Sequence, residues 1–425
     1  MAKSILQPKP AVVCGTMVVL LMLWTLWPSN FATISELTKL TDAAVGTPAC
    51  STAPNGSLSL HHDDPANTTF YDDPNLSYSI DKPIKNWDKK RRQWLNHHPS
   101  FAAAGERIFV LTGSQPWPCK NPIGDHLLLR LFKNKVDYCR IHGYDLFYNN
   151  ALLHPAMPAY WAKIPVVRAA MLAHPEAEWI LWVDSDAVFT DMDFKPPLDR
   201  YKSHNLVVDG WPNLIYEKRS WVAVNAGVFL IRNCQWSMDF LQVWAGMGPQ
   251  TPNYEKWGQI LTSTLTDKMY PNSDDQSALV YLLLKEKAKW GPKIYIENQY
   301  TLSGYWAGIL GSLDSIGDGY VKVEEAAARE LRRRDGEKMW EHYAAIRDAY
   351  LKDGGAARRP FITHFTGCQP CSGDHPGYTD EACWNGIEKA LNFADNQVLR
   401  SYGFVRPDLQ NSSSLLPLSF DFSSL

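Results

Sequence analysis

Apolar residues recur along the chain with two alternating periods, which predict short strands and amphipathic helices. Strands are predicted at 107–111, 145–148 and 179–183, where four or five mostly apolar residues follow one another. Between them, 125–141 and 158–173 have helical spacing, and a glycine follows the first of these segments as a C-cap. This alternation predicts a Rossmann-like nucleotide-binding half within an α/β fold.

The third predicted strand is wholly apolar and ends at two carboxylates, Asp184 and Asp186. Wholly apolar strands lie at the centre of a sheet, and α/β proteins bind ligands at the carboxyl ends of such strands. Two acids one residue apart repel each other, so they suit a hard cation such as Mg²⁺ or Mn²⁺, which also binds nucleotide phosphates. An acidic turn without a metal is the alternative that this motif alone leaves open.

Further strands, at 206–208 and 227–231, are predicted to form a second half of the domain. The segment 271–276 then places Ser273 as the N-cap of a helix with acids in its first turn. Helix capping alone explains these acids, although their position after a substrate-like half favours a functional role.

The last third of the chain combines a charged helix with a short strand. We predict a solvated surface helix at 321–352 and a strand at 360–365. This strand delivers His364 into a loop that contains a glycine and two cysteines, which makes the histidine a candidate metal ligand.

The first 100 residues differ in composition from the rest. Lys3 and Lys9 precede an uncharged run at 11–27, which is at the short limit for crossing a bilayer of about 30 Å. The pattern predicts a type II membrane anchor after a cytoplasmic tail at 1–10, with a cleaved signal peptide as the alternative. A lumenal stem is predicted at 28–100, a catalytic domain at 101–405 and a C-terminal tail at 406–425.

Sequons and cysteines agree with a lumenal location. Four N-glycosylation sequons begin at Asn55, Asn67, Asn75 and Asn411. The cysteines outside the predicted anchor and stem are Cys119, Cys139, Cys234, Cys368, Cys371 and Cys383. Six cysteines in an oxidising lumen suggest disulfides, with fifteen pairings open. Half a zinc site at Cys368 and Cys371 is the alternative, although no second pair matches it.

Composition narrows the class of partner. The net charge of -3 gives no electrostatic footprint for nucleic acid, so no nucleic-acid partner is expected. Seventeen Trp and nineteen Tyr are more than core packing usually requires, and flat rings suit the apolar faces of sugars. Core packing and Trp-rich loops are the competing explanation for these aromatic residues.

Four strings of residues carry a resemblance to a known family: Val183-Asp184-Ser185-Asp186-Ala187, Asn225-Ala226-Gly227-Val228-Phe229-Leu230-Ile231-Arg232, Ser273-Asp274-Asp275-Gln276 and His364-Phe365-Thr366-Gly367-Cys368. They resemble the plant Golgi family that contains galactomannan galactosyltransferases and xyloglucan xylosyltransferases, over roughly 70–402. The resemblance implies a GT-A fold, a Mn²⁺ ion and retaining α-1,6 transfer from a UDP-sugar to a β-1,4-linked polysaccharide acceptor.

The resemblance also implies roles for individual residues. The metal ligands would be Asp184, Asp186 and His364. The residues beside the anomeric carbon would be Asp274, Asp275 and Gln276. The donor-binding residues would be Gly113, Ser114, Lys163, Asp184, Ser185, Asp186, Gly367 and Gln369. Retention through a covalent intermediate and front-face attack within an ion pair both remain open.

One position distinguishes the two branches of the family. The xylosyltransferase branch carries Lys where this chain has Gln369, so the resemblance favours transfer of galactose from UDP-galactose to mannan. A xyloglucan 6-xylosyltransferase is the alternative enzyme, and an inactive Golgi scaffold or sugar-binding protein is an alternative of another class. The expected setting is the Golgi membrane, as a homodimer or in a complex with a backbone synthase or related glycosyltransferases.

Overall fold

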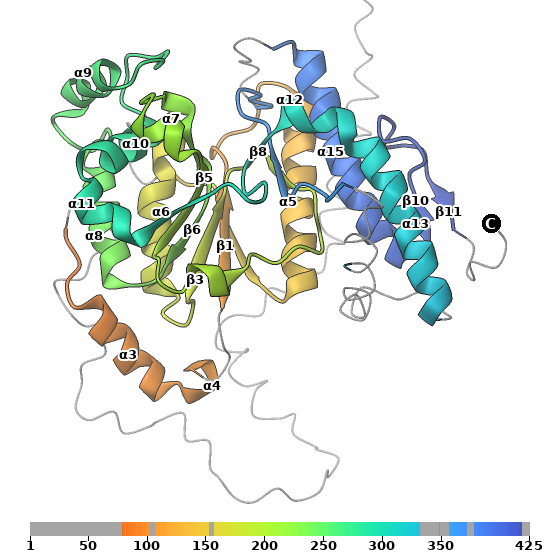
Figure 1. Cartoon of the computed structure of the whole chain (residues 1–425), viewed down its shortest axis with the longest axis horizontal. Coiled ribbons are helices and arrows are strands. Elements are labelled where there is room, and N and C mark those ends of the chain that lie inside the picture. The colour runs from red at the N-terminus through yellow and green to blue at the C-terminus, as the bar shows by residue number, and fades with distance from the viewer. Residues whose placement is uncertain are drawn as a thin grey trace, which may run out of the picture. The chain divides into compact units, whose positions relative to one another are not determined.

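A six-stranded sheet with the order β2-β1-β3-β6-β5-β7 is at the centre of the computed structural model (Figure 1). The structure describes residues 79–80, 82–102, 107–152, 157–331, 348, 357–371 and 378–418, and these residues belong to one compact unit. The strands of the sheet are β1 (Ile108–Gly113), β2 (Asp145–Asn149), β3 (Trp179–Val183), β5 (Leu206–Gly210), β6 (Val224–Arg232) and β7 (Ile294–Glu297).

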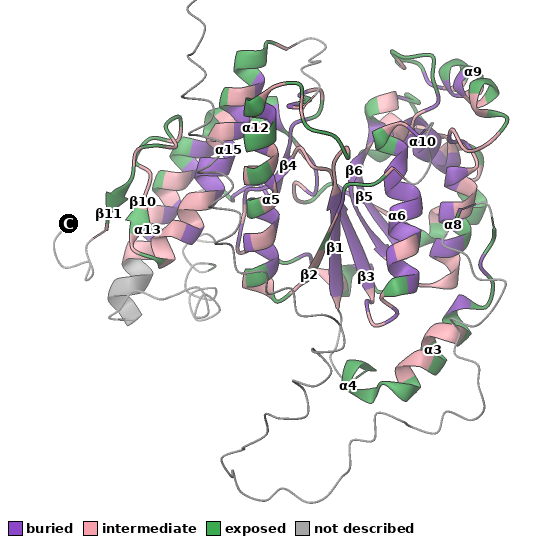
Figure 2. Ribbon diagram, turned by 180° about the vertical axis from the view of Figure 1, so that it is seen from behind, coloured by how far each residue is buried: buried purple, intermediate pink, exposed green. Residues whose placement is uncertain are grey.

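Helices cover both faces of this sheet (Figure 2). One face packs against α6 (Ala159–Ala173), α8 (Gln235–Ala245) and α10 (Asp275–Lys285). The core on the other face is formed with α5 (Pro122–His142); α15 (Asp380–Ser401) packs against α5, and α13 (Leu313–Leu331) packs against α15. In β3, Ile180 and Trp182 pack on the first face while Trp179 and Leu181 pack on the second. The continuous apolar run of β3 therefore reflects burial on both sides.

The remaining described elements are short or peripheral. The helices are α3 (Trp87–His97), α4 (Pro99–Ala102), α7 (Pro212–Tyr216), α9 (Tyr254–Thr264), α11 (Lys287–Trp290) and α12 (Trp306–Ile309). The 3-10 turns are η2 (Leu198–Tyr201), η3 (Trp221–Ala223), η4 (Gly291–Lys293) and η5 (Leu310–Ser312). The last two strands, β10 (Phe404–Val405) and β11 (Leu416–Pro417), pair with each other.

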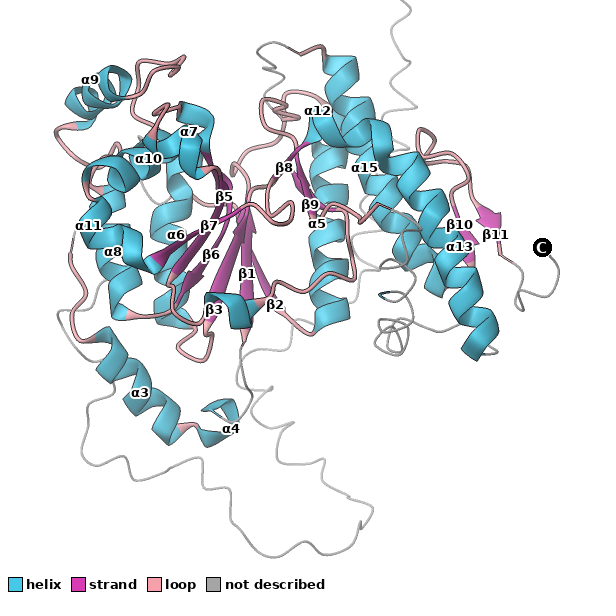
Figure 3. Cartoon of the chain, viewed as in Figure 1, coloured by secondary structure: helices cyan, strands magenta, loops and turns pink. Residues whose placement is uncertain are grey.

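A second, three-stranded sheet lies beside the main one, in the order β4-β9-β8. Its strands are β4 (Ala187–Phe189), β9 (Ile362–His364) and β8 (Gly304–Tyr305). Figure 3 shows β8 and β9 next to α5 and α12 rather than within the main sheet. Because β4 starts only three residues after β3 ends, the acidic turn at 184–186 joins the two sheets.

Most predicted elements are confirmed, with small shifts at their ends. The helix predicted at 125–141 is α5, and Gly143 caps it with φ 69°, a backbone conformation that suits glycine. The strands predicted at 206–208 and 227–231 are β5 and β6. They do not form a separate half, because β6 pairs antiparallel with β3 and continues the same sheet.

Two helix starts were predicted wrongly. The N-cap of α10 is Asp274, whose side chain accepts from the Ser277 N–H, whereas the predicted cap Ser273 is buried and donates to the Met247 carbonyl. Ser and Asp are both good N-caps, so the sequence alone did not distinguish Ser273 from Asp274 as the capping residue. The helix predicted at 321–352 starts earlier, as α13 at Leu313, and its part beyond 331 lies outside the described residues except for residue 348.

The predicted anchor at 11–27 and the sequons at Asn55, Asn67 and Asn75 lie outside the described residues, whereas Asn411 is described and exposed. Among the helices that the structure describes, none has the length and apolar character needed to cross a bilayer. Within the predicted stem, α3 is a helix, and Trp87 at its start is fully buried in the core.

Candidate active site

The turn between the two sheets presents both predicted metal-binding carboxylates. Asp184 follows β3, and its backbone N–H donates to the Gly227 carbonyl at 2.8 Å. The Asp186 carbonyl accepts from the Phe365 N–H at 3.1 Å. These bonds attach one end of the turn to β6 and the other to the segment after β9. The two carboxylates are therefore held by the backbone of both sheets.

Lys135 of α5 supports the same turn and was not predicted. Its ammonium is fully buried and donates to the carbonyls of Ser185 at 3.2 Å and Ala187 at 2.7 Å. Burial lowers the pKa of Lys135 to about 8, against the opposing effect of the two aspartates. Ser185 was predicted to bind the donor, and its carbonyl stabilises the turn by accepting this bond from Lys135. Helical spacing alone gives no sign that a lysine points inward.

His364 completes the predicted metal-binding set. It is the last residue of β9, where it is paired with Ala187 and Tyr305 of the neighbouring strands. Its Nε2 atom lies 3.3 Å from Asp186 Oδ1 and 3.9 Å from Asp184 Oδ2. One ligand atom from each of the three residues lies within 4.8 Å of the other two. The structure therefore brings His364 to two carboxylates that are far from it in the sequence.

The charge state of His364 follows from this arrangement. Burial alone would disfavour the imidazolium, but the carboxylates of Asp186 and Asp184 outweigh it and raise the pKa of His364 above its usual value. The two acids therefore favour a proton on the imidazole. A divalent cation would compete with that proton, since two carboxylates and a neutral imidazole suit Mn²⁺ and related ions.

Gly227 provides the space in which these side chains meet. A Cβ at this position would lie 2.2 Å from His364 Cε1 and 2.6 Å from Asp184 Oδ2. Any larger residue would displace the imidazole or the carboxylate. The glycine was in the quoted string 225–232, but its contact with the site depends on the pairing of β3 with β6 and could not be inferred from the string.

Lys163 of α6 joins the metal-binding set to the predicted catalytic segment. Its ammonium is 2% exposed and lies 3.1 Å from Asp184 Oδ1 and 2.9 Å from Asp275 Oδ2. Burial alone would lower the pKa of Lys163, but the two carboxylates raise it, so the side chain stays charged. Trp182 Nε1 also donates to Asp184 Oδ1 at 2.6 Å, so this carboxylate is held from two sides.

The three predicted catalytic residues have different environments. Asp275 is 5% exposed, and burial raises its pKa to about 6, against the opposing effect of Lys163. Asp274 Oδ1 accepts from Ser277 N and Trp221 Nε1, and its Oδ2 accepts from Ser277 Oγ and Lys268. The Asp274 carboxylate is thus occupied by contacts that fix the start of α10.

Gln276 bridges two elements at the edge of the site. Its Oε1 atom accepts from the Ala226 N–H at 3.2 Å, and its Nε2 donates to the Trp221 carbonyl at 3.1 Å. The side chain therefore attaches η3 and β6 to the start of α10. Each of its two polar atoms retains capacity for one further hydrogen bond.

A cavity of about 410 Å³ opens next to the acidic turn. Its lining includes most of the predicted donor-binding residues, namely Gly113, Ser114, Asp184, Ser185, Asp186 and Gln369. Lys163, Gly367, His364 and the segment 274–276 are not part of the lining. Trp117 and Tyr160 also line the cavity and are exposed. This volume is in the range of small-molecule binding sites.

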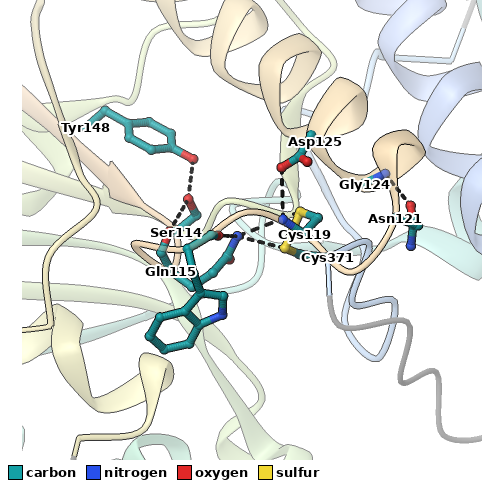
Figure 4. Close-up of a disulfide and its surroundings, with 9 residues drawn as sticks. Ser114, Gln115, Cys119, Asn121, Gly124, Asp125, Tyr148 and Cys371 are labelled. Carbon is teal, nitrogen blue, oxygen red and sulfur yellow. Dashed lines mark hydrogen bonds between the residues drawn. A yellow bond between two sulfur atoms is a disulfide. The ribbon is translucent and has the colours of Figure 1, made fainter. Parts of the chain in front are cut away.

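The loop after β1 forms one wall of this cavity. A Cβ on Gly113 would lie 2.3 Å from the Asn149 carbonyl oxygen, so glycine permits the close approach of β1 and β2. Ser114 Oγ accepts from Tyr148 at 2.8 Å (Figure 4). The Ser114 N–H donates to the Asn149 carbonyl. These contacts fix the backbone at the carboxyl ends of two parallel strands, where α/β proteins bind nucleotides.

Two disulfides hold the loop that follows β9. Cys119 pairs with Cys371 across 252 residues, and Gln115 Nε2 donates to Cys371 Sγ at 2.7 Å (Figure 4). Cys368 pairs with Cys383 at the start of α15. The preference for disulfides is confirmed for these four cysteines, and the half zinc site is ruled out because Cys368 and Cys371 have other partners.

The loop after His364 contains one cysteine of each disulfide, Cys368 and Cys371. Gly367 adopts φ 86°, and a Cβ there would lie 2.8 Å from the Tyr378 ring, so the turn requires glycine. Gln369 follows and lines the cavity. Cys139 and Cys234, which were counted among the candidates for disulfides, are free thiols.

Comparison with known proteins identifies the family. The model of the galactosyl transferase GMA12/MNN10 family matches residues 104–375, which contain the three candidate metal ligands and all residues that line the cavity. The chain belongs to this family. It is therefore a member of a family of glycosyltransferases with a mixed α/β fold.

Three relatives bear on specificity. Galactomannan galactosyltransferase 1 of Cyamopsis tetragonoloba is 56% identical over 419 residues, which are 96% of this chain and 94% of the relative. Glycosyltransferase 6 of Arabidopsis thaliana is 62% identical over 84% of both chains. Probable xyloglucan 6-xylosyltransferase 3 of Arabidopsis thaliana is 47% identical over 78% of this chain and 66% of the relative.

Among solved structures, galactosyltransferase LgtC in complex with donor and acceptor sugar analogs is 11% identical, covers 67% of this chain and 95% of that chain, and gives a TM-score of 0.31.

Proposed function

We propose that the chain transfers galactose from UDP-galactose, in α-1,6 linkage and with retention, to the β-1,4-mannan backbone of galactomannan. The observation that carries the reaction class is the convergence of Asp184, Asp186 and His364 beside a cavity that six predicted donor-binding residues line. The choice of galactose and mannan rests on the galactomannan galactosyltransferase relative, whose identity extends over nearly the full length of both chains.

Asp184, Asp186 and His364 would hold Mn²⁺, which supplies Lewis-acid stabilisation of the charge that develops on the leaving diphosphate. The backbone contacts of the acidic turn and the buried Lys135 hold the two carboxylates in place before the ligand arrives. A prearranged set of ligands reduces the reorganisation that binding and catalysis require.

Lys163 and Asp275 are the buried pair next to the metal-binding set. The Lys163 ammonium neutralises part of the negative charge of Asp184 and Asp275, and so permits these two carboxylates to lie close together. Asp275 is then the carboxylate best placed to stabilise positive charge at the anomeric carbon, since Asp274 is occupied as a helix cap. Gln276 would position the sugar through its remaining hydrogen-bonding capacity.

Gln369 supports the choice of donor. A neutral amide both donates and accepts hydrogen bonds, so it can pair with the C6 hydroxyl that galactose has and xylose lacks. A lysine at the same position would instead act as a point charge toward phosphate. A site built to pair with a hydroxyl discriminates strongly against a donor without it, because its own polar groups would be left unpaired.

The proposed setting is the Golgi membrane, with the anchor at 11–27 and the catalytic domain in the lumen. The sequons and the two disulfides support an oxidising compartment. A homodimer, or a complex with a backbone synthase or related glycosyltransferases, belongs to the same proposal. Association with a backbone synthase would place the enzyme next to its growing acceptor.

A xyloglucan 6-xylosyltransferase acting on β-1,4-glucan is the second candidate, favoured by the relative of that name at 47% identity. An inactive scaffold is disfavoured, because a protein without activity has no need for the three converging ligands or the charge-balancing Lys163. The deciding experiment incubates the purified chain with Mn²⁺, each UDP-sugar in turn, and manno- or cello-oligosaccharides. Galactosylated manno-oligosaccharide with an α-1,6 linkage is the expected product.

A further inference from the structure

The proposed metal ligands come from two different sheets. Asp184 follows β3 of the six-stranded sheet, whereas His364 ends β9 of the three-stranded sheet. Their spacing therefore depends on how the two sheets are attached to each other. The turn at 184–186 attaches the two sheets to each other at one point. This turn carries the two carboxylates, but it does not set the orientation of the His364 imidazole.

A buried carboxyl that the proposed reaction does not use lies between the sheets. Asp209, near the end of β5, is buried, and its carboxyl faces the Ser303 backbone N–H. The pairing of β5 with β6 shifts register between Val208 and Asp209. Such a bulge changes the direction in which a side chain points, and bulges are common next to active sites. The irregularity therefore coincides with the residue whose carboxyl faces Ser303.

Ser303 continues this contact to the proposed metal ligand. It immediately precedes β8, whose Tyr305 is paired with His364, and it is itself buried. Its hydroxyl oxygen lies 3.1 Å from His364 Nδ1. For Nε2 to bind a cation, Nδ1 must carry the proton, so Nδ1–H would donate to Ser303 Oγ. The serine thus selects the tautomer and the ring orientation that direct Nε2 toward Asp184 and Asp186.

We propose that Ser303 is a positioning residue that orients His364 for metal binding, with Asp209 of the main sheet supporting it. The Ser303 hydroxyl holds the imidazole at 3.1 Å, and the Asp209 carboxyl faces the Ser303 backbone. The inference rests on the proposed function only in taking Asp184, Asp186 and His364 as metal ligands. It assigns a purpose to a buried carboxyl and a strand irregularity that the reaction itself does not require.

The test measures Mn²⁺ affinity of the purified chain from the electron paramagnetic resonance signal of free Mn²⁺, with and without UDP. Ser303→Ala removes the acceptor for Nδ1–H and is expected to weaken Mn²⁺ binding by about 10–100-fold, the usual effect of losing such a partner. Ser303→Thr keeps the hydroxyl and should retain affinity within about threefold. Ser315→Ala is the matched control, because Ser315 is exposed and its hydroxyl bonds only a local helix carbonyl among the contacts described.

Asp209→Ala should weaken Mn²⁺ binding in the same direction, and near-UV circular dichroism reports whether its fold is kept. If that variant does not fold, Ser303→Ala and Ser303→Thr decide the question. Wild-type affinity in Ser303→Ala, with His364→Ala clearly weaker, would overturn the positioning role and leave the metal site intact. Equal affinity of wild type and His364→Ala would overturn the metal site, and the inference with it.

Discussion

At the scale of single residues, the site depends on a position without a side chain. Gly227 is the point where a residue of β6 faces both Asp184 and His364, and the missing Cβ leaves room for them. The metal-binding set can therefore be disturbed without removing any ligand.

Gly227→Ala is expected to weaken Mn²⁺-dependent UDP binding by at least about tenfold, because the new methyl group must displace the imidazole or the carboxylate. Isothermal titration with UDP and Mn²⁺ measures this. Gly308→Ala is the control, since a Cβ on Gly308 in α12 meets no atom within 4 Å. Equal losses in both variants would show that the effect is not local to the site.

The protonation of His364 gives a second prediction at this scale. Because Asp186 and Asp184 raise the pKa of His364 despite its burial, protons compete with Mn²⁺ below that raised pKa. Mn²⁺ affinity measured from about pH 8 to about pH 5 should be constant at first and then fall, approaching about tenfold per pH unit. The loss occurs on acidification, since the neutral imidazole is the ligand. An affinity that stays flat through about pH 6 would contradict this coupling.

At the scale of elements, the sequence predicted the parts better than their contacts. The strand 179–183 and the helix α5 were recognisable because burial on two faces and helical spacing leave strong local patterns. Asp184, Asp186 and His364 were recognised through short motifs at strand ends. Lys135, Gly227 and Ser303 were missed, because their roles arise from elements that meet only in the folded chain.

The disulfides show the same limit. Six cysteines in an oxidising lumen predicted disulfides, but the pairing of Cys119 with Cys371 depends on the loops after β1 and β9 lying side by side. Spacing in the sequence carries no information about that contact. Cys139 is buried within α5, where burial raises its pKa to about 12 and keeps the thiol unreactive.

Replacing Cys119 and Cys371 by Ser should lower the free energy of unfolding by about 2–5 kcal/mol and weaken UDP-sugar binding, because Cys371 and Gln369 line the same cavity wall. Chemical denaturation and titration with the donor measure the two effects. Cys234→Ser, which removes a free thiol, should change the free energy of unfolding by less than about 1 kcal/mol. Unaltered donor affinity in the double variant would show that this disulfide does not contribute to donor binding in the cavity.

At the scale of the whole molecule, the segment before the sheet contributes to the core. Ile80, Ile84 and Trp87 are buried, and Trp87 Nε1 donates to Asn233 Oδ1 at 2.7 Å. Composition alone assigned this segment to the stem, because its charged and polar residues dominate the average. A catalytic domain beginning at residue 101 would lack these contacts.

A chain that begins at residue 101 should therefore unfold at a lower temperature than one that begins at residue 67. Each buried side chain lost would cost about 1.5–3 kcal/mol of hydrophobic stabilisation, so the truncated domain should be markedly less stable. Thermal denaturation of the two chains by circular dichroism is the measurement. Matching melting temperatures would mean that the segment is not needed for stability.

The donor and the acceptor are properties of the whole site, and they are the centre of this account. The most direct test is the ratio of kcat/KM for UDP-galactose and UDP-xylose, measured with mannohexaose and with cellohexaose in the presence of Mn²⁺. We predict that UDP-galactose with mannohexaose is the preferred combination, and that Gln369→Lys narrows the preference for UDP-galactose. A wild-type preference for UDP-xylose with cellohexaose would contradict the account and make the enzyme a xylosyltransferase.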